Sequence, residues 1–290
     1  MAWQRWRERL IEFTIRLCGI SCIAIVTLIF LFLAKEGFAL FRTVSIAGFL
    51  SGDRWYPISE PPRFGILPLL LGSCLVTAGA VVLSVPVGIA SALFVSEIAA
   101  GWTKEVLKTG IELVAAIPSV VLGFIGITVL APAIKQVFGL PTGLTALTGS
   151  ITLAFMAMPT IVSITEEALA AVPRGHREVA LALGATRWQM MWRVLLPAAG
   201  SGIVAAVMLG IGRVIGETMA VMMVTGNAAV IPHTFLRPVR TMTATIAAEM
   251  GETVRGSDHY AALFAIGIVL FVISFIINMI ADLFLHQERH

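Results

Sequence analysis

Long apolar runs alternate with shorter polar segments along almost the whole chain. Six runs are long enough to cross a membrane, because an α-helix needs about 20 apolar residues to span a hydrocarbon core of ~30 Å. Each run is continuously apolar, which predicts helices and excludes a transmembrane β-barrel with its alternating strands. We expect membrane-spanning helices at residues 17–41, 67–95, 109–130, 146–170, 198–224 and 260–285.

The composition agrees with this pattern. Of the 290 residues, 58% are hydrophobic and only 13% are charged, whereas about a quarter of the residues in a soluble domain are charged. The predicted fold class is therefore an all-α polytopic membrane protein. Outside the spans we expect an N-terminal segment, an external loop, a long polar loop and a short tail, at residues 1–16, 42–66, 171–197 and 286–290.

Basic residues predict the orientation. An even number of spans places both termini on the same side, and the denser set of basic residues lies on that side, so the positive-inside rule places the termini and the polar loop in the cytoplasm. The net charge of +3 follows from this topology and gives no reason to expect nucleic acid as a partner. The basic residues assigned to the cytoplasmic side are Arg5, Arg7, Arg9, Arg16, Lys104, Lys108, Arg174, Arg177, Arg187, Arg193 and Arg289.

The polar loop at residues 171–197 has a helical pattern of its own. It predicts one helix at residues 178–183, a break at Gly184, and a second helical stretch at residues 188–196 that stops at Pro197. A structured helical loop on the membrane face suggests a docking surface for a soluble partner. The alternative interpretation is that its arginines and tryptophans only anchor the chain at the membrane surface.

Arg213 and Glu217 lie deep in the fifth apolar run, with Arg213 about 22 Å along a helix that starts at residue 198. Their i,i+4 spacing predicts side chains on one helix face, where they can form an ion pair. An ionised group at this depth costs at least ~2.5–3.5 kcal/mol and normally faces a bundle interior or an aqueous path. We interpret Arg213 as a ligand for an anion, with Glu217 competing for its guanidinium and Thr218 as a further candidate. The alternative is an ion pair that only fixes helix packing.

The chain has no signature of catalysis. It contains no phosphate-binding G-x-x-x-x-G-K-[ST] run, no nucleophile–base arrangement and no metal-type cysteine spacing. We therefore expect no enzymatic activity, no bound metal and no cofactor in this chain. Of the other charged residues, Glu112 is expected either to snorkel to the membrane surface or to pair with Lys108 at i,i+4. Glu166 and Glu167 are expected to mark the membrane boundary of the fourth span.

The polar loop resembles the EAA loop of ABC-importer permeases, in which a Glu, small residues and a Gly precede an aliphatic-x-Leu-Pro run. The candidate coupling residues in this loop are Glu178, Ala180, Gly184, Arg187, Leu196 and Pro197. The chain as a whole resembles PstC-type permease subunits of the bacterial phosphate-specific ABC transporter. The regions that carry this resemblance are residues 49–73, 85–97 and 210–227.

The resemblance implies a type I ABC-importer (MetI-like) permease fold over residues 67–285, in the bacterial cytoplasmic (inner) membrane. It implies a heterodimer with a PstA-like permease, a PstB-like ATPase dimer that holds ATP-Mg, and an external PstS-like phosphate-binding protein. It also implies that Arg213 and Glu217 matter for transport of inorganic phosphate. Two alternatives remain open: transport of another oxyanion (sulfate, molybdate or phosphonate), and a subunit that signals phosphate status. A channel has no need of a docking loop, and a membrane enzyme lacks a catalytic set.

Overall fold

The computed structural model describes the backbone of residues 2–287 and the side chains of residues 9–280. Most of this chain is helical, and its only paired strands within the described residues form one short hairpin. Four helices continue into a five-residue segment of another helix type, labelled η1 to η4. η1 is a 3₁₀ helix, and η2, η3 and η4 are π-helices. The elements are α1 (Ala2–Gly37), η1 (Phe38–Arg42), α2 (Ile46–Ser51), β1 (Trp55–Tyr56), β2 (Arg63–Phe64), α3 (Leu67–Leu93), η2 (Phe94–Ile98), α4 (Trp102–Ala116), α5 (Ser119–Ile125), η3 (Gly126–Leu130), α6 (Ala131–Phe138), α7 (Ala146–Ala171), α8 (Arg174–Ala182), α9 (Arg187–Met190), η4 (Met191–Leu195), α10 (Leu196–Ala198), α11 (Gly200–Gly216), α12 (Met219–Val224), α13 (Met242–Glu249) and α14 (Asp258–Gln287).

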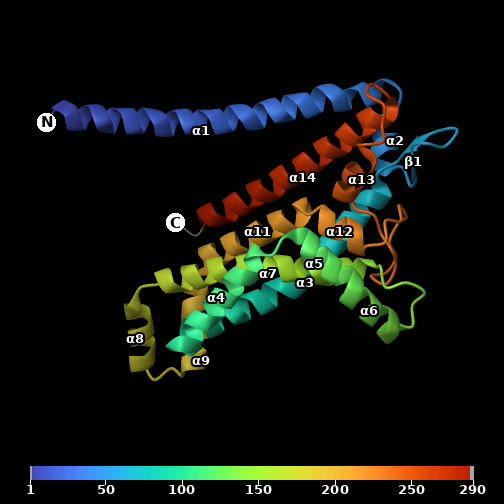
Figure 1. Ribbon diagram of the computed structural model, residues 1–290. Coiled ribbons are helices and arrows are strands. Elements are labelled where there is room, and N and C mark those ends of the chain that lie inside the picture. Colours follow the sequence, from blue (N-terminus) through green and yellow to red (C-terminus); the bar gives the residue numbers. More distant parts are fainter. Residues whose placement is uncertain (1, 288–290) are drawn as a thin grey trace.

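The molecule has two distinct ends, which we name after elements that mark them. The α8 end carries α8 and α9, together with the start of α1 and the end of α14 (Figure 1). The β1 end carries α2, the β1–β2 hairpin and α13. In the part of the chain that the structure describes, five helices are long and apolar enough to cross a membrane, or six if the bent pair Arg187–Ala198 and Gly200–Gly216 counts as one span. The long helices run between the two ends.

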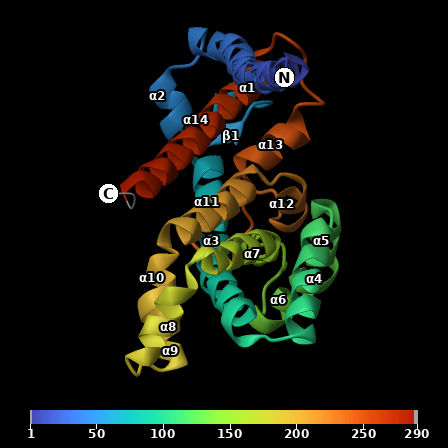
Figure 2. The same ribbon diagram turned by 90° about the vertical axis from the view of Figure 1, so that its left-hand side faces the viewer.

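α7 is the central helix of the bundle. Of the five long helices it is the most buried, at 61% of its most apolar stretch, against 39% for α3 and none for α1. Viewed from the α8 end, it lies among α3, α11 and α4 (Figure 2). Ile161, near its middle, is 1% exposed and is held between two glycines. A Cβ atom at Gly88 of α3 would lie 2.8 Å from Ile161, and one at Gly210 of α11 would lie 2.7 Å from it. Small residues therefore allow three helices to approach closely, as expected where lipid supplies no hydrophobic drive for helix association.

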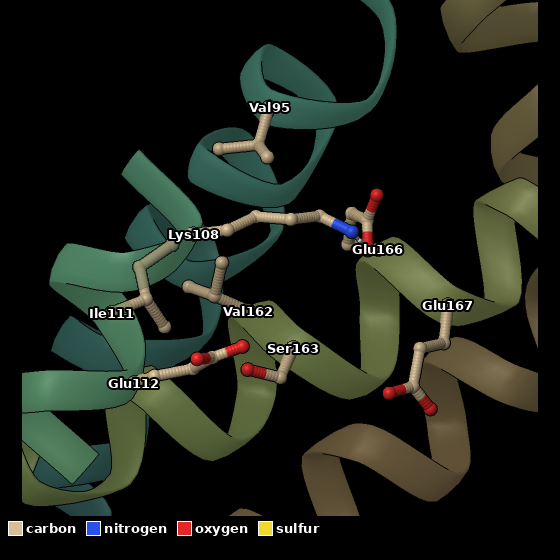
Figure 3. A pocket seen from close by; sticks show the side chains of 8 residues that line it. All are labelled: Val95, Lys108, Ile111, Glu112, Val162, Ser163, Glu166 and Glu167. Atoms are coloured by element: carbon tan, nitrogen blue, oxygen red, sulfur yellow. Dashed lines mark ion pairs between the residues drawn. The ribbon is translucent and has the colours of Figure 1, made fainter. Parts of the chain in front are cut away.

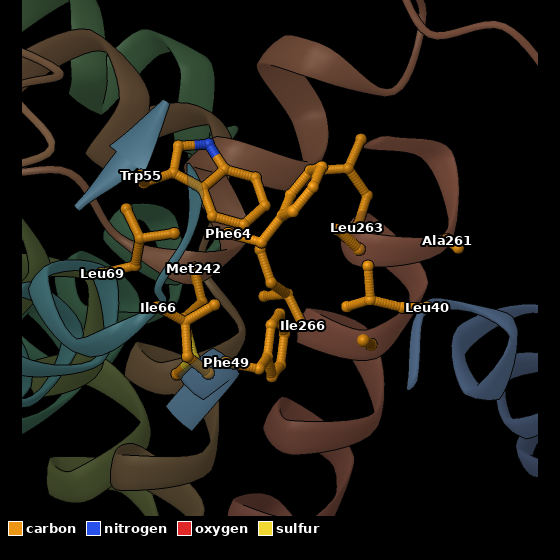
Figure 4. Packing of buried hydrophobic residues seen from close by; sticks show 12 residues of the cluster. Leu40, Phe49, Trp55, Phe64, Ile66, Leu69, Met242, Ala261, Leu263 and Ile266 are labelled. Carbon is orange, nitrogen blue, oxygen red and sulfur yellow. The ribbon is translucent and has the colours of Figure 1, made fainter. Parts of the chain in front are cut away.

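The β1 end is closed by an aromatic and aliphatic cluster. Phe49 of α2, Trp55 of β1 and Phe64 of β2 pack against α14, around Ile266 (Figure 4). The Trp55 and Phe64 rings meet edge to face with their centroids 6.2 Å apart, a favoured aromatic geometry. This cluster attaches the loop after α1 to the bundle.

The first helix stands apart from the bundle. α1 diverges from α14 along its length and approaches it only near its own C-terminal end (Figure 1). There, Phe30 and Phe32 contact Phe271 and Phe264, with ring centroids 5.0 and 5.5 Å apart. Most of its apolar surface is therefore open to lipid or to another chain.

The expected third span, residues 109–130, is not one continuous helix. The helix stops at Ala116, and Ile117 is extended (ψ 126°), because the residue before a proline, here Pro118, is pushed out of the helical region. The segment here that is long and apolar enough to cross a membrane is Ser119–Phe138. α4 is a separate helix with no fully buried residue.

The expected fifth span, residues 198–224, is not one helix. α11 is bent by 74° from the preceding helical segment and ends at Gly216, and α12 follows after a break. The second helical stretch of the polar loop does not stop at Pro197, because α10 continues to Ala198 and the bend comes after it. The predicted tail, residues 286–290, lies outside the described residues except for residues 286 and 287, which end α14.

We predict that Gly88→Val destabilises the protein, because the new side chain must displace the buried Ile161. Overpacking of this kind costs about 1–3 kcal/mol. Thermal unfolding of the detergent-purified protein should show a lower Tm. Gly110→Val on α4, where an added Cβ meets nothing within 4 Å, is the matched control and should unfold as the wild type does. Equal Tm values for the two variants would contradict the close approach of α3 and α7.

Candidate functional site

The break between α11 and α12 has a defined hydrogen-bond structure. Glu217 is extended (φ −68°, ψ 132°), and its carbonyl oxygen accepts a 2.8 Å hydrogen bond from the Thr243 hydroxyl of α13. Its carboxylate accepts a 3.1 Å hydrogen bond from the backbone N–H of Ala220 in the first turn of α12. Glu217, one residue before the N-cap position Thr218, therefore caps a free amide in the first turn of α12, and its negative charge suits a helix N-terminus. Thr218 donates to the Gly216 carbonyl at 3.1 Å within the same break.

Arg213 lies one turn before the break and is exposed on the surface of this chain. One of its terminal nitrogens donates to the Thr160 hydroxyl of α7 at 3.2 Å. No carboxylate among the described side chains lies within ion-pair distance of it. A guanidinium has five N–H donors, so most of its hydrogen-bonding capacity faces outward from this chain.

The predicted ion pair between Arg213 and Glu217 is therefore wrong in this structure. The i,i+4 rule requires a continuous helix, and the helix ends at Gly216, between the two residues. The Glu217 carboxylate instead accepts a hydrogen bond from the backbone N–H of Ala220. The residue that the structure brings to Arg213 is Thr160.

The predicted docking loop forms a compact helical unit at the α8 end (Figure 1). Glu178 and Arg187 are exposed on its surface, whereas Ala180 is 7% exposed and packs with Leu169 and Leu195. The small side chain of Ala180 allows α8 to lie close to the end of α7. Leu196 is half-buried and Pro197 is exposed, just before the bend into α11.

Gly184 turns the chain between α8 and α9. Its φ of +83° lies in the left-handed region, which a glycine adopts without the penalty of a side chain. α9 then begins with a capping box. The Thr186 hydroxyl accepts from the backbone N–H of Gln189, and the side-chain oxygen of Gln189 accepts from the backbone N–H of Thr186. Local sequence thus fixes the turn between α8 and α9.

Two carboxylates at the α8 end, one buried and one partly buried, were not predicted as ion-pair partners. Glu166 of α7, 8% exposed, pairs with Lys104 at 3.4 Å and with Lys108 at 2.9 Å, both from α4. Figure 3 shows the Lys108 amino group directed at the Glu166 carboxylate, beside a small pocket of about 90 Å³. Of the two alternatives for Glu112, pairing with Lys108 is not seen among the described side chains, because α4 turns its lysines toward α7. The second carboxylate, Glu97, binds Arg177 of α8.

A polar network at the β1 end was also not predicted. The Glu249 carboxylate accepts hydrogen bonds from Trp55 Nε1 (3.1 Å) and an Arg240 terminal nitrogen (2.6 Å), and lies 2.8 Å from His259 Nε2. These groups border an open pocket of about 850 Å³. Sequence spacing gives no signal for this network, because Trp55 and Glu249 are far apart along the chain and meet only through the hairpin.

The family described as "binding-protein-dependent transport system inner membrane component" matches residues 84–289. The chain is 43% identical to the probable ABC transporter permease protein YqgH of Bacillus subtilis, over 89% of this chain and 84% of YqgH. It is 36% identical to the phosphate transport system permease protein PstC of Mesorhizobium japonicum, over 80% of this chain and 76% of that protein. It is 30% identical to PstC of Haemophilus influenzae, over 99% of this chain and 95% of that protein.

Solved structures of ABC importers have the same fold. A bacterial ABC transporter involved in the import of alginate matches with a TM-score of 0.66 at 16% identity, over 98% of this chain and 99% of that chain. An inward-facing MetNI methionine ABC transporter matches with a TM-score of 0.58 at 22% identity, over 77% of this chain and 94% of that chain. The predicted MetI-like permease fold is confirmed.

We predict that the two roles of Glu217 separate by substitution. Glu217→Gln keeps an acceptor oxygen for the Ala220 amide, so stability should stay close to that of the wild type. Glu217→Ala removes the cap, which costs about 1 kcal/mol and should lower the Tm by about 2 °C for a chain of this size. Thermal unfolding of the purified protein measures both. If the Gln variant loses as much stability as the Ala variant, the charge and not the cap holds α12.

Proposed function

Because the chain belongs to the family of inner membrane components of binding-protein-dependent transport systems, we propose that it is the PstC-type permease subunit of an importer for inorganic phosphate. The observation that carries this proposal is the similarity to proteins named PstC, which are 30–36% identical over most of the chain. The exposed Arg213 beside the α11–α12 break supports it with chemistry of its own.

Arg213 is suited to a tetrahedral oxyanion. Its planar guanidinium can donate to two oxygens of one phosphate, and in this chain only Thr160 occupies it among the described groups. In a permease heterodimer, this exposed face of α11 would line the cavity between the two subunits. Arg213 would then be a point at which phosphate is bound and released during transport.

Glu217 and Thr218 have a different role in this proposal. They form the break that separates α11 from α12 and that is tied to α13 through Thr243. A break of this kind allows α12 to change its direction relative to α11 without loss of backbone hydrogen bonds within either helix. We assign Glu217 to the gate, as the cap of α12, and Thr218 to the same hinge.

The α8 end would face the cytoplasm. There α8 and α9 would dock into a PstB-like ATPase dimer, through a surface that includes Glu178, Arg187 and exposed apolar side chains such as Leu183 (83% exposed). ATP-Mg would be bound and hydrolysed by that partner, and this chain supplies no catalytic residue. A PstA-like permease would complete the translocation path, and a PstS-like binding protein would deliver phosphate at the β1 end.

Transport would follow alternating access. Closure of the ATPase dimer would displace α8 and α9 and rotate the attached helices, so that the cavity beside Arg213 opens to one side at a time. Such coupling needs a difference in interaction free energy between the two states. An alternative cargo among sulfate, molybdate and phosphonate has no specific observation in its favour. A role in signalling phosphate status is compatible with transport.

We predict that Arg213→Gln lowers phosphate uptake about 10- to 100-fold, because a charge-assisted hydrogen bond contributes about 1.5–3 kcal/mol. The measurement is ATP-dependent uptake of radiolabelled phosphate into proteoliposomes that contain the complete complex and its binding protein. Lys135→Gln, which removes an exposed cation near the end of α6, is the control and should transport normally.

Competition in the same assay tests the cargo. Unlabelled phosphate should abolish uptake of the label, whereas equal concentrations of sulfate, molybdate or a phosphonate should not. Wild-type uptake by an assembled Arg213→Gln complex would contradict the role of Arg213.

We predict that Gly184→Val reduces uptake without preventing assembly of the two permeases. A residue with a side chain at φ +83° costs about 1–2 kcal/mol, and the strain would displace α9 from its docking position. Gly139→Val provides a matched control, because Gly139 is also left-handed (φ +62°) but follows α6, on the side of the molecule away from α8 and α9 (Figure 1). Equal loss of uptake in both variants would argue against a specific role of the α8–α9 turn.

A further inference from the structure

Arg177 attaches α8 to the membrane-spanning helices. Its Nε and one terminal nitrogen donate to the Glu97 carboxylate at 3.2 and 2.8 Å, and Glu97 lies in η2 at the end of α3. The terminal nitrogens also donate to the carbonyl oxygens of Leu169 and Val172, each at 2.8 Å. One guanidinium thus joins α8 to the end of α3 and to the end of α7.

The bonds to Leu169 and Val172 lie at the C-terminal end of α7, where the Leu169 carbonyl also accepts from the Val172 backbone N–H at 3.3 Å. The last carbonyl groups of an α-helix have no partner within the helix, and a cation near them interacts favourably with the helix dipole. Only an arginine has donors in a geometry that reaches a carboxylate and two carbonyl oxygens together. A lysine at position 177 would keep the charge but not this set of contacts.

Arg177 points inward although its neighbours point outward. The side chains of Arg177 and Glu97 are 20% and 12% exposed, whereas Arg174 and Glu178, on the same helix, are exposed. Exposed ion pairs contribute little to stability, but this pair is largely shielded from water. Besides it, α8 is held by a small apolar contact around Ala180.

We propose that the Arg177–Glu97 pair is the joint through which a displacement of α8 reaches α3 and α7. The proposal rests on the function proposed above, in which α8 meets the ATPase. α7 carries Thr160, which contacts Arg213. Both α8 and the candidate anion site are therefore in contact with α7. Arg177 is a positioning residue: it touches neither phosphate nor ATP, and it acts by keeping α8 fixed to the bundle.

The experiment uses the complete complex in proteoliposomes and measures phosphate uptake and ATP hydrolysis in the same sample. The variants are Arg177→Gln, Arg177→Lys, Glu97→Gln and the double variant Arg177→Gln/Glu97→Gln, with Lys135→Gln as the control. The readout is phosphate transported per ATP hydrolysed. A residue with a purely structural role would lower uptake and hydrolysis together and leave this ratio unchanged.

We expect Arg177→Gln to lower the ratio at least about 5-fold, within the range by which substitutions along a coupling route change coupling. Glu97→Gln should lower it less, since Arg177 keeps its bonds to α7, and Arg177→Lys should be intermediate. The double variant should be no worse than Arg177→Gln alone, because residues in one network have non-additive effects.

Two results would overturn the proposal: an unchanged ratio in the assembled variants, or fully additive defects in the double variant. If the Arg177→Gln complex does not assemble, the Glu97→Gln complex is tested alone. An unchanged amount of phosphate transported per ATP hydrolysed in that variant would then overturn the proposal. Failure of the proposed function is recognised separately, because the wild-type complex would then fail to accumulate phosphate at all.

Discussion

The contact of Ile161 with Gly88 on one side and Gly210 on the other determines how the rest of the bundle is arranged. Lipid is as apolar as the helices, so close packing has to hold the spans together. An added Cβ at either glycine would lie within 3 Å of Ile161, and the three helices therefore have little freedom to slide or separate. This places Thr160, the residue of α7 that precedes Ile161, against Arg213 of α11. It also fixes the end of α7 where α8 is attached.

The charged groups are arranged around this rigid unit. At the α8 end, Glu166 forms ion pairs with two lysines of α4, and Glu97 forms an ion pair with Arg177. α4 and α8 are therefore each attached to the spans by ion pairs. At the β1 end, the Glu249 carboxylate accepts hydrogen bonds from Trp55 and Arg240 and lies next to His259. Between them, Arg213 has no carboxylate partner among the described side chains. A charge held near a rigid helix and left free to bind is what an anion path requires, whereas a structural ion pair would bury both partners.

Much of this architecture could be predicted from the sequence. Apolar runs identified a helical membrane protein, and the pattern of Glu178, Gly184 and Pro197 indicated a folded loop. The errors come from local backbone effects that hydropathy does not record. Pro118 ends α4 before the third span begins, and Gly216 with Glu217 breaks the fifth. The i,i+4 spacing of Arg213 and Glu217 failed because it presumes an unbroken helix. Arg177 and Glu97 lie far apart in sequence, and no spacing rule connects them.

A distance measurement tests most directly whether α8 moves as one body with α3 and α7. Spin labels at Val179 of α8 and Val82 of α3, both exposed, would be placed in a complex whose native Cys18, Cys22 and Cys74 are replaced. Electron paramagnetic resonance would compare the distance between the labels with and without ATP. Our account predicts the same narrow distribution in both states, and a broader one in Arg177→Gln. A change in the distance between α8 and α3 in an otherwise wild-type, transporting complex would contradict it.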